Sequence, residues 1–402
     1  MPLYREHIAQ ELEEKKSEFT REIGQEAIEE YQDAASSLDE AFEKTELEKK
    51  LKELESPCAL PTTEFDEGLI HCFDDSSSWE SHEAVNEWAR DRLERIPTVA
   101  ADGSQIDPVT EFEQPVGLVQ VVWIANNHSP EKDYKERVET VVLTPGDLLF
   151  ENPNTGYIQV DEQKVPVSRF ETEMHVLEDQ VKEHRDAENP PVVMYDGSLI
   201  LSFTQMFDQK TQDRYAEALS RLLAASEHHQ VPVIGYISGS KATELGRIIQ
   251  DLDLVDKSQS VRDYQIFSDL MENWGSRTAL FSSRRDSTLN RLQTTYHGVD
   301  YGFSEDILFT YLNIGTGSQL DRIELPEWIL EEDKIEYVLS IVRAECGVGR
   351  GYPEILQAVD ADAVISRNER EEFLRMYQDF SEEHDIDLRW DNKALSKKRR
   401  RR

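Results

Sequence analysis

The sequence predicts an α/β fold in which a mixed β-sheet is elaborated by an N-terminal helical arm and by C-terminal helices. Three observations lead to this prediction. The first 55 residues carry apolar side chains at helical spacing among Glu and Lys, with no proline between Leu3 and Ser56. Short apolar runs bounded by turn residues, which are typical of strands, follow from Thr98. After Pro191, strands and helices alternate, as they do where crossover helices join parallel strands.

The composition limits the class of protein. The chain has 402 residues, enough for a large core, and it contains no apolar run of membrane-spanning length. From its first residues, Met1-Pro-Leu-Tyr-Arg-Glu, we expect no signal peptide. Its three cysteines (Cys58, Cys72 and Cys346) form no CxxC pair, so we expect a cytoplasmic location and neither a disulfide framework nor a structural zinc site. A formal net charge of -38 repels nucleic acid unless basic residues or metal ions are concentrated locally.

We divide the chain into three parts. Residues 1–97 form the helical arm and a mixed lead-in that includes a short helix over 83–96. Residues 98–390 form one α/β domain, because no linker interrupts them. Residues 391–402 form a basic tail, in which Lys397–Arg402 is a candidate phosphate contact or a solubility feature. The usual role of an arm of this kind is packing or dimerisation.

The α/β domain opens with a group of strands. They are expected in four runs: 99–101, 117–125, 137–143 and a weaker run at 157–160 that would extend the same sheet. Short connections favour antiparallel pairing between them. An amphipathic helix over about 167–184 follows.

The alternating part begins after this helix. Its expected elements are a strand at 192–195, a helix at 212–228, a strand at 231–237, a helix at 242–252, short strands at 278–281, 307–312 and 321–325, and helices near 328–344, 353–366 and 368–384. The order of antiparallel strands, helix, strand, helix, strand and helix is that of a ribonuclease H-like core.

Two copies of the tripeptide Asp-Gly-Ser occur in matching contexts. Asp102 and Asp196 each follow a proline and a short apolar run and precede Gly-Ser. A single Asp-Gly-Ser usually marks a turn. Two copies place two carboxylates at the ends of neighbouring strands, where they can share divalent ions, because hard cations take oxygen ligands.

Further acids stand where this topology needs ligands. The helix before Asp196 offers Glu171, Glu173, Glu178 and Asp179, and the late helix offers Asp360 and Asp362. Helical spacing turns Asp362 away from Asp360. A site of this kind hydrolyses phosphodiesters with two ions about 3.5–4 Å apart, one generating hydroxide and one stabilising the leaving oxygen.

With these residues in order, the chain resembles the NurA family of DNA end-processing nucleases from about Thr98 to Phe380. The family's first and central motifs resemble the strands that end in Asp102-Gly-Ser and Asp196-Gly-Ser-Leu. The family also places a metal-binding glutamate on a helix, and its register after Arg169 favours Glu173, with Glu171 and Glu178 as alternatives.

Three later segments extend the resemblance. Gly235–Lys241 resembles a Gly-Tyr-x-Lys-Ser segment, but the expected lysine position holds Ser238, which leaves Lys241 displaced by three residues. Arg322–Trp328 resembles an Arg-x-Glu-x-Pro segment, although Arg322 and Glu324 also fit a simple cross-strand pair. Tyr352-Pro-Glu-Ile-Leu, followed by Asp360, Ala363 and Ile365, resembles the last motif, in which many members carry histidine at the place of Asp360.

The resemblance implies a manganese-dependent 5′–3′ exonuclease with possible single-strand endonuclease activity, using two ions, with Mg²⁺ as a substitute for Mn²⁺. It implies a homodimer that processes DNA ends beside a HerA-type hexameric translocating ATPase. The implied catalytic residues and metal ligands are Asp102, Glu173, Asp196 and Asp360, and the implied substrate contacts are Lys241, Ser198 and Arg322. The chain itself has no Gly-x-x-x-x-Gly-Lys-Ser/Thr loop, so we do not expect it to hydrolyse nucleoside triphosphates.

Two other interpretations remain open. One is a non-catalytic acidic adaptor or nucleic-acid mimic that binds a DNA-processing motor. The presence of acids at all four ligand positions argues against it, because a nucleic-acid mimic needs negative charges spread over its surface, whereas these acids are expected to point inward toward one site. The other is a ribonuclease H-like enzyme that acts on RNA or on a junction.

Overall fold

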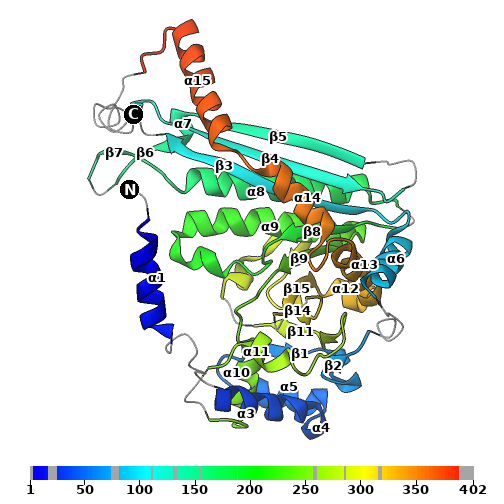
Figure 1. Ribbon diagram of the computed structural model, residues 1–402. Coiled ribbons are helices and arrows are strands. Elements are labelled where there is room, and N and C mark those ends of the chain that lie inside the picture. Colours follow the sequence, from blue (N-terminus) through cyan, green and yellow to red (C-terminus); the bar gives the residue numbers. More distant parts are fainter. Residues whose placement is uncertain are drawn as a thin grey trace.

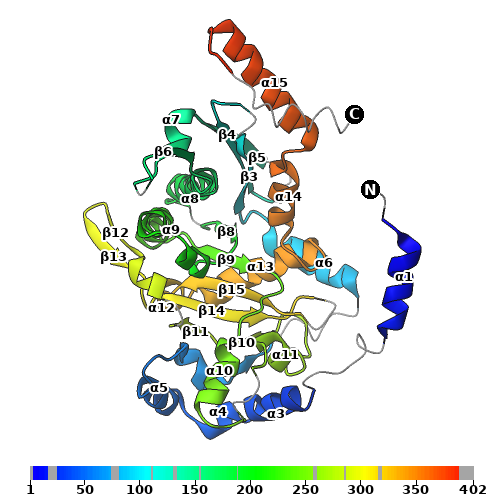
Figure 2. The same ribbon diagram turned by 90° about the vertical axis from the view of Figure 1, so that its left-hand side faces the viewer.

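The structure is a computed structural model that describes residues 3–16, 25–73, 81–109, 112–129, 134–153, 155–187, 189–256, 260–284, 287–315 and 319–388. The predicted basic tail at 391–402 lies outside these residues. A large mixed sheet runs through the molecule, with helices on both faces (Figures 1 and 2). No helix among the described residues is long and apolar enough to cross a membrane.

Five strands form the half of the sheet that matters most for the site. β3 (Thr98–Val109), β4 (Val116–Asn126) and β5 (Tyr134–Leu143) pair as an antiparallel meander. β8 (Val192–Asp196) pairs parallel to β3, and β9 (Val233–Ile237) pairs parallel to β8. The spatial order is therefore β5-β4-β3-β8-β9, with β5 at the edge.

The other half of the sheet is antiparallel. β15 (Asp321–Pro326) joins β9 and is followed outward by β14 (Ile307–Leu312), β11 (Phe281–Ser283) and β1 (Ala59–Pro61), while β10 (Arg277–Thr278) pairs with β14 and with β2 (Ile70–His71). β1 and β2 come from the predicted lead-in, so this part of the chain belongs to the same sheet as the α/β domain.

Two helices, α8 (Lys164–Glu183) and α9 (Gln209–His229), cover one face of the strands β3, β4 and β8. Their apolar stripes pack with alternate residues of β3 and β4, among them Val99, Ala101 and Val121. The Asp208 side chain caps α9 by accepting a hydrogen bond from Thr211 N.

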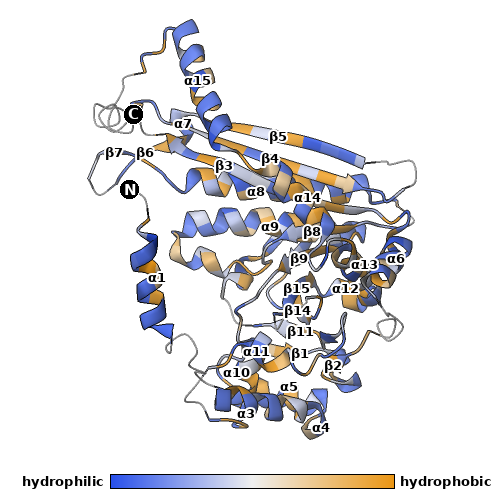
Figure 3. Cartoon of the chain, in the orientation of Figure 1, coloured by the Kyte–Doolittle hydropathy of each residue, from blue (hydrophilic) through white to orange (hydrophobic). Residues whose placement is uncertain are grey.

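The opposite face carries a second core. It is covered by α6 (His82–Leu93), α12 (Trp328–Glu331), α13 (Ile335–Val348) and α14 (Glu354–Ala363). α15 (Arg367–Glu383) continues along this side over the ends of β3 and β4 and then projects from the body (Figure 1). Figure 3 shows that α15 is mostly hydrophilic, whereas the strands and the inner helices carry the apolar residues.

The described part of the N-terminal region is helical, as predicted, in helices of 4 to 12 residues. α1 (Arg5–Glu14) has no buried residue and stands apart from the body in both views (Figures 1 and 2). The next helices are α3 (Gln25–Ser36), α4 (Leu38–Ala41) and α5 (Lys44–Lys52), and they form a third core with α10 (Glu244–Asp251), α11 (Asp263–Phe267) and the outer strands.

Several strands differ from the sequence predictions. The run at 157–160 does not extend the large sheet, because β7 (Ile158–Val160) pairs with β6 (Leu149–Glu151) in a separate ribbon beyond the short helix α7 (Pro145–Leu148). A hairpin of β12 (Gln293–Tyr296) and β13 (Val299–Gly302) was not predicted. β3 is also much longer than the predicted run at 99–101.

Candidate metal centre

The register between β3 and β8 brings the two Asp-Gly-Ser aspartates together. Ala101 pairs with Tyr195 on the parallel neighbouring strand, so Asp102 and Asp196 follow at the same level. Side chains alternate between the faces of a sheet, so both carboxylates leave on the face of Ala100, which is the face that α14 covers. Neighbouring strands lie about 4.8 Å apart, and the two aspartates therefore stand side by side.

Only one of the two aspartates ends a strand. β8 stops at Asp196, as predicted, and Gly197 takes a positive φ of 159°. β3 instead continues through Asp102, Gly103 and Ser104 because these residues stay paired with β4. The predicted turn after Asp102 is thus wrong, although its carboxylate is held as rigidly by the sheet as a strand end would hold it.

Asp360 lies on α14, close enough to both aspartates for its charge to act on them. The negative charge of Asp360 contributes to a raised pKa of both Asp102 and Asp196, after the larger effect of partial removal from water. The Tyr352 hydroxyl, just before α14, hydrogen-bonds the Asp196 carboxylate and opposes this rise in its pKa. Asp362 lies elsewhere, as predicted, where its charge acts on Tyr134 at the start of β5.

The helix α14 is itself tied down at both ends. Near its start, Ile355 N donates to Glu345 Oε2 at 2.9 Å, and Glu345 Oε1 accepts from Thr98 Oγ1 of β3 at 2.7 Å. Just after its end, Ile365 N donates to Ser104 Oγ at 3.2 Å. These contacts hold Asp360 over the strand that carries Asp102.

Glu173 approaches from α8, on the other face of the sheet. It comes close where β3 has no side chain, because a Cβ on Gly103 would overlap Glu173 Oε1 and would lie 2.8 Å from Arg169 Cγ. Arg169 Nη1 donates to Gly103 O at 2.8 Å and lies 3.6 Å from Glu173 Oε1. The glycine after Asp102 is therefore explained by the close approach of Glu173 and Arg169 to β3, and not by a turn.

The carboxylate of Glu173 is buried and incompletely paired. The residue is 4% exposed, and its Oε1 has no hydrogen-bond partner. Burial raises the pKa of Glu173 to about 7, against the effect of Arg169, and the negative charges of Asp102 and Asp196 add to the rise. A buried oxygen without a donor is costly unless something else binds it, and a cation fits that need.

The other acids of α8 face away from the aspartates. Glu171 is paired with Arg214 of α9, whose Nε donates at 2.7 Å. Glu178 is paired with Arg221 at 3.0 Å and with Lys182 at 2.8 Å. Among the four candidates on this helix, the structure turns Glu173 toward Asp102 and Asp196.

The three predicted substrate contacts fare differently. Lys241 is exposed in the segment between β9 and α10. Ser198 is half-buried and donates its hydroxyl hydrogen bond to Glu324 Oε2 at 2.8 Å. Arg322 is 2% exposed and its guanidinium is paired with Glu244 and Glu324, so it belongs to the interior and has no surface that a phosphate can reach.

Sequence reasoning missed the roles of two neighbours of the acids. Tyr352 belongs to the segment Tyr352-Pro-Glu-Ile-Leu, but nothing in its spacing indicates that its hydroxyl hydrogen-bonds Asp196. Arg169 was used only to set the register of Glu173, yet its charge acts on Asp102 as well as on Glu173. The spacing of Arg169 four residues before Glu173 could have indicated this ion pair, because such residues are neighbours on a helix.

The donor set fits divalent cations. Four carboxylates come from four elements, and such oxygen ligands suit Mg²⁺ and Mn²⁺. In the part of the chain that the structure describes, no three Asp, Glu, His or Cys side chains already converge as the ligands of one ion. Like charges held near one another repel, and a bound cation would offset that repulsion.

The chain is similar to one protein-family model and to several solved structures. A family model described as the NurA domain matches residues 97–365. Among solved structures, the chain is similar to a crystal structure of NurA bound to dAMP and manganese, with 9% identity and a TM-score of 0.34 over 72% of this chain and 92% of that one. It is similar to a crystal structure of NurA with manganese, with 10% identity and a TM-score of 0.30 over 74% of this chain and 96% of that one. It is also similar to a crystal structure of Drosophila Piwi, with 10% identity and a TM-score of 0.24 over 64% of this chain and 27% of that one. No curated protein matches the chain.

Proposed function

Because the chain belongs to the NurA family, whose model matches more than half of it, we propose that it is a metal-dependent DNA nuclease that hydrolyses phosphodiester bonds. The observation that carries this proposal is the placement of four acids on neighbouring elements. Asp102 and Asp196 lie side by side on β3 and β8, Glu173 of α8 lies against Gly103, and Asp360 lies on α14, which packs on β3. The strand order β5-β4-β3-β8-β9, with a meander followed by two parallel strands, supports a ribonuclease H-like core.

The four acids are the proposed ligands of two Mn²⁺ ions, for which Mg²⁺ can substitute. When bound, such ions activate water at neutral pH and neutralise charge on the leaving oxygen. Asp102 and Asp196 sit on rigid neighbouring strands, which keeps the reacting groups aligned for attack. Tyr352 orients the Asp196 carboxylate, and Arg169 places a positive charge beside Asp102 and Glu173.

The proposed substrate is linear DNA, which is degraded in the 5′–3′ direction, with single-strand endonuclease activity beside it. A chain of net charge -38 attracts DNA poorly, which supports a partner that feeds DNA to it. A HerA-type hexameric ATPase is the proposed partner, since this chain has no nucleotide-binding loop of its own. The exposed Lys241 remains the proposed phosphate contact.

The test compares single substitutions in the presence of Mn²⁺. Asp102→Ala, Asp196→Ala and Asp360→Ala are expected to abolish degradation of linear DNA while circular dichroism shows a folded protein. Asp362→Ala is the matched control, because this acid lies on the same helix but acts on Tyr134. A wild-type protein that is inert with Mn²⁺ and Mg²⁺, even beside a HerA-type ATPase, would contradict the proposal and leave the acidic adaptor in its place.

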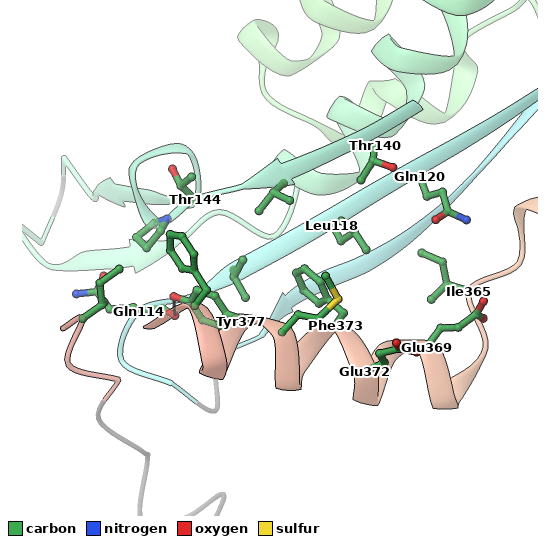
Figure 4. A pocket seen from close by; sticks show the side chains of 16 residues that line it. Gln114, Leu118, Gln120, Thr140, Thr144, Ile365, Glu369, Glu372, Phe373 and Tyr377 are labelled. Carbon is green, nitrogen blue, oxygen red and sulfur yellow. Dashed lines mark hydrogen bonds between the residues drawn. The ribbon is translucent and has the colours of Figure 1, made fainter. Parts of the chain in front are cut away.

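A homodimer is also proposed, and the structure offers a surface for it. A groove of about 830 Å³ lies between α15 and the outer face of β4 and β5 (Figure 4). Apolar side chains at its borders are exposed, among them Val142 (51%), Met376 (64%) and Phe380 (50%). β5 is also an edge strand, and edge strands are open to pairing.

Sedimentation tests this surface. Met376→Glu and Phe380→Glu, made together, are expected to convert a dimer into a monomer, because they place charges in the apolar groove. Met206→Glu is the control, since Met206 is 81% exposed but does not line the groove. An unchanged dimer in the double variant would exclude the groove as the interface.

A further inference from the structure

The turn that follows Asp196 lies directly on β9. Gly235 of β9 pairs with Tyr195 on one side and with Glu324 of β15 on the other. A Cβ on Gly235 would lie only 2.6 Å from Gly197 O and 3.3 Å from Leu199 N. The missing side chain at Gly235 therefore lets the turn cross β9 and reach β15.

At β15 the turn meets one buried carboxylate. Glu324 is 1% exposed, and its Oε2 accepts two hydrogen bonds of 2.8 Å, one from Ser198 Oγ and one from Leu199 N. Hydrogen bonds to a carboxylate are stronger than those between neutral groups. The residues two and three positions after Asp196 are thus fixed to a strand that lies two strands away from β8.

Arg322 fixes Glu324 in turn. Its Nε donates to Glu324 Oε1 at 2.8 Å, and its two terminal nitrogens donate to Glu244 at 2.8 and 3.0 Å. The guanidinium also lies 3.9 Å from the centre of the Phe309 ring. A guanidinium held on all sides in this way leaves Glu324 little freedom to move.

We propose that Glu324 is a positioning residue that acts through the turn on Asp196, and this inference rests on the function proposed above. β8 holds Asp196 from the N-terminal side by strand pairing, and Glu324 holds the chain from the C-terminal side. With Glu324 in place, the Asp196 carboxylate stays level with Asp102 and ready to bind metal. Ser198 then serves the protein framework rather than the substrate.

The experiment measures Mn²⁺ affinity by isothermal titration calorimetry in the absence of DNA, and kcat and KM for linear DNA separately. The main comparison is Glu324→Ala against Glu244→Ala. Both substitutions remove one buried carboxylate from Arg322, and both are expected to lower the melting temperature. Only Glu324 touches the turn. Loss of an outer partner of a metal ligand typically weakens metal binding or activity 10–100-fold.

We expect about a 10–100-fold loss of Mn²⁺ affinity and a matching fall of kcat in Glu324→Ala, against a change of less than about threefold in Glu244→Ala. Glu324→Gln retains an acceptor oxygen for the turn, and it is expected to recover most of the Mn²⁺ affinity without recovering the melting temperature. If Glu324→Ala does not fold, Ser198→Ala replaces it, because this change removes one of the two bonds to Glu324 and leaves the buried charges intact. It also removes the contacts of Ser198 Oγ with Ile200 N and Ile200 O within the turn, each at 3.0 Å.

Several results would overturn the inference. One is a folded Glu324→Ala with wild-type Mn²⁺ affinity, and another is an equal loss of affinity in Glu244→Ala. A third is a Ser198→Ala variant in which KM for DNA rises while Mn²⁺ affinity stays unchanged, since that would make Ser198 a substrate contact. A wild-type chain that neither binds Mn²⁺ nor cleaves DNA is a different outcome, because it contradicts the proposed function itself.

Discussion

Gly103 is the residue on which the approach of Glu173 depends. Gly103→Ala would push a methyl group against Glu173 Oε1 and Arg169 Cγ. We expect Mn²⁺-dependent cleavage to fall at least about tenfold in a folded protein, because displaced ligands and reacting groups are costly to catalysis. Gly302→Ala is the control, since nothing lies within 4 Å of a Cβ there. Equal rates for the two variants would show that Glu173 adapts without cost.

Glu173 also makes the stability of the metal-free protein depend on pH. The pKa of Glu173 is raised to about 7 in the folded chain, against about 4.3 for an unfolded glutamate. Between these values the folded state binds more protons than the unfolded state, so the free energy of unfolding falls as pH rises from about 4.3 to about 7. Glu173→Gln removes this contribution.

Urea denaturation in EDTA at a series of pH values checks this expectation. The free energy of unfolding of Glu173→Gln minus that of the wild type is expected to increase as pH rises from about 4.3 to about 7. Above pH 7 this difference is expected to stay constant. The difference between the two proteins reports the titration of Glu173 together with its charge coupling to Asp102 and Asp196. A difference that does not change with pH would contradict the raised pKa of Glu173.

At the scale of elements, one buried carboxylate ties the start of α14 to β3. Glu345 is 1% exposed and joins Ile355 of the helix to Thr98 of β3. Glu345→Ala leaves Ile355 N and Thr98 Oγ1 without their buried acceptor, and each such loss costs about 1–3 kcal/mol. We expect faster amide hydrogen exchange throughout α14 and lower nuclease activity, because Asp360 is then less well held.

Hydrogen-exchange mass spectrometry measures the first effect directly. Glu369→Ala is a suitable control, because Glu369 completes the capping box of the next helix, α15, at the surface. This change is expected to loosen the start of α15 and to leave α14 and the cleavage rate unaltered. Unchanged exchange in α14 of Glu345→Ala would show that packing alone holds the helix.

Sequence patterns predicted the elements of the α/β half well where each has a clear period. β4, β8, α8 and α9 lie close to their predicted ranges, because strong apolar runs and stripes report on packing against the two cores. The end of β3 was missed because Gly103-Ser104 reads locally as a turn, whereas pairing with β4 decides the conformation. The β12–β13 hairpin has too little apolar alternation to be found.

Some residues of the candidate site could also be predicted from the sequence, and others could not. The two aspartates were predictable because each follows its own apolar strand, and the family register selected Glu173 among four acids of α8. The interior position of Arg322 was not predictable, because an arginine in a short motif gives no sign that two buried glutamates will enclose it. The contact of Glu324 with the turn after Asp196 was not predictable either, because Glu324 lies on a strand that is distant in sequence.

The whole molecule carries a charge that should make its stability depend on salt. A net charge of -38 repels itself in the compact state, and added salt screens that repulsion. We therefore expect the melting temperature of the metal-free protein to rise as KCl is increased from about 0.05 to 0.5 M, where the Debye length falls below about 10 Å. Differential scanning calorimetry measures it, and a melting temperature that falls over this range would contradict the expectation.

The spread of the four acids along the chain has a consequence for biosynthesis. Asp102 emerges from the ribosome early, whereas Asp360 and its helix α14 emerge only after most of the chain has been made. A nascent chain, or one cut before Tyr352, contains three of the acids but neither Asp360 nor the tyrosine that orients Asp196. The four proposed ligands are therefore present together only once nearly all of the folded body has been synthesised.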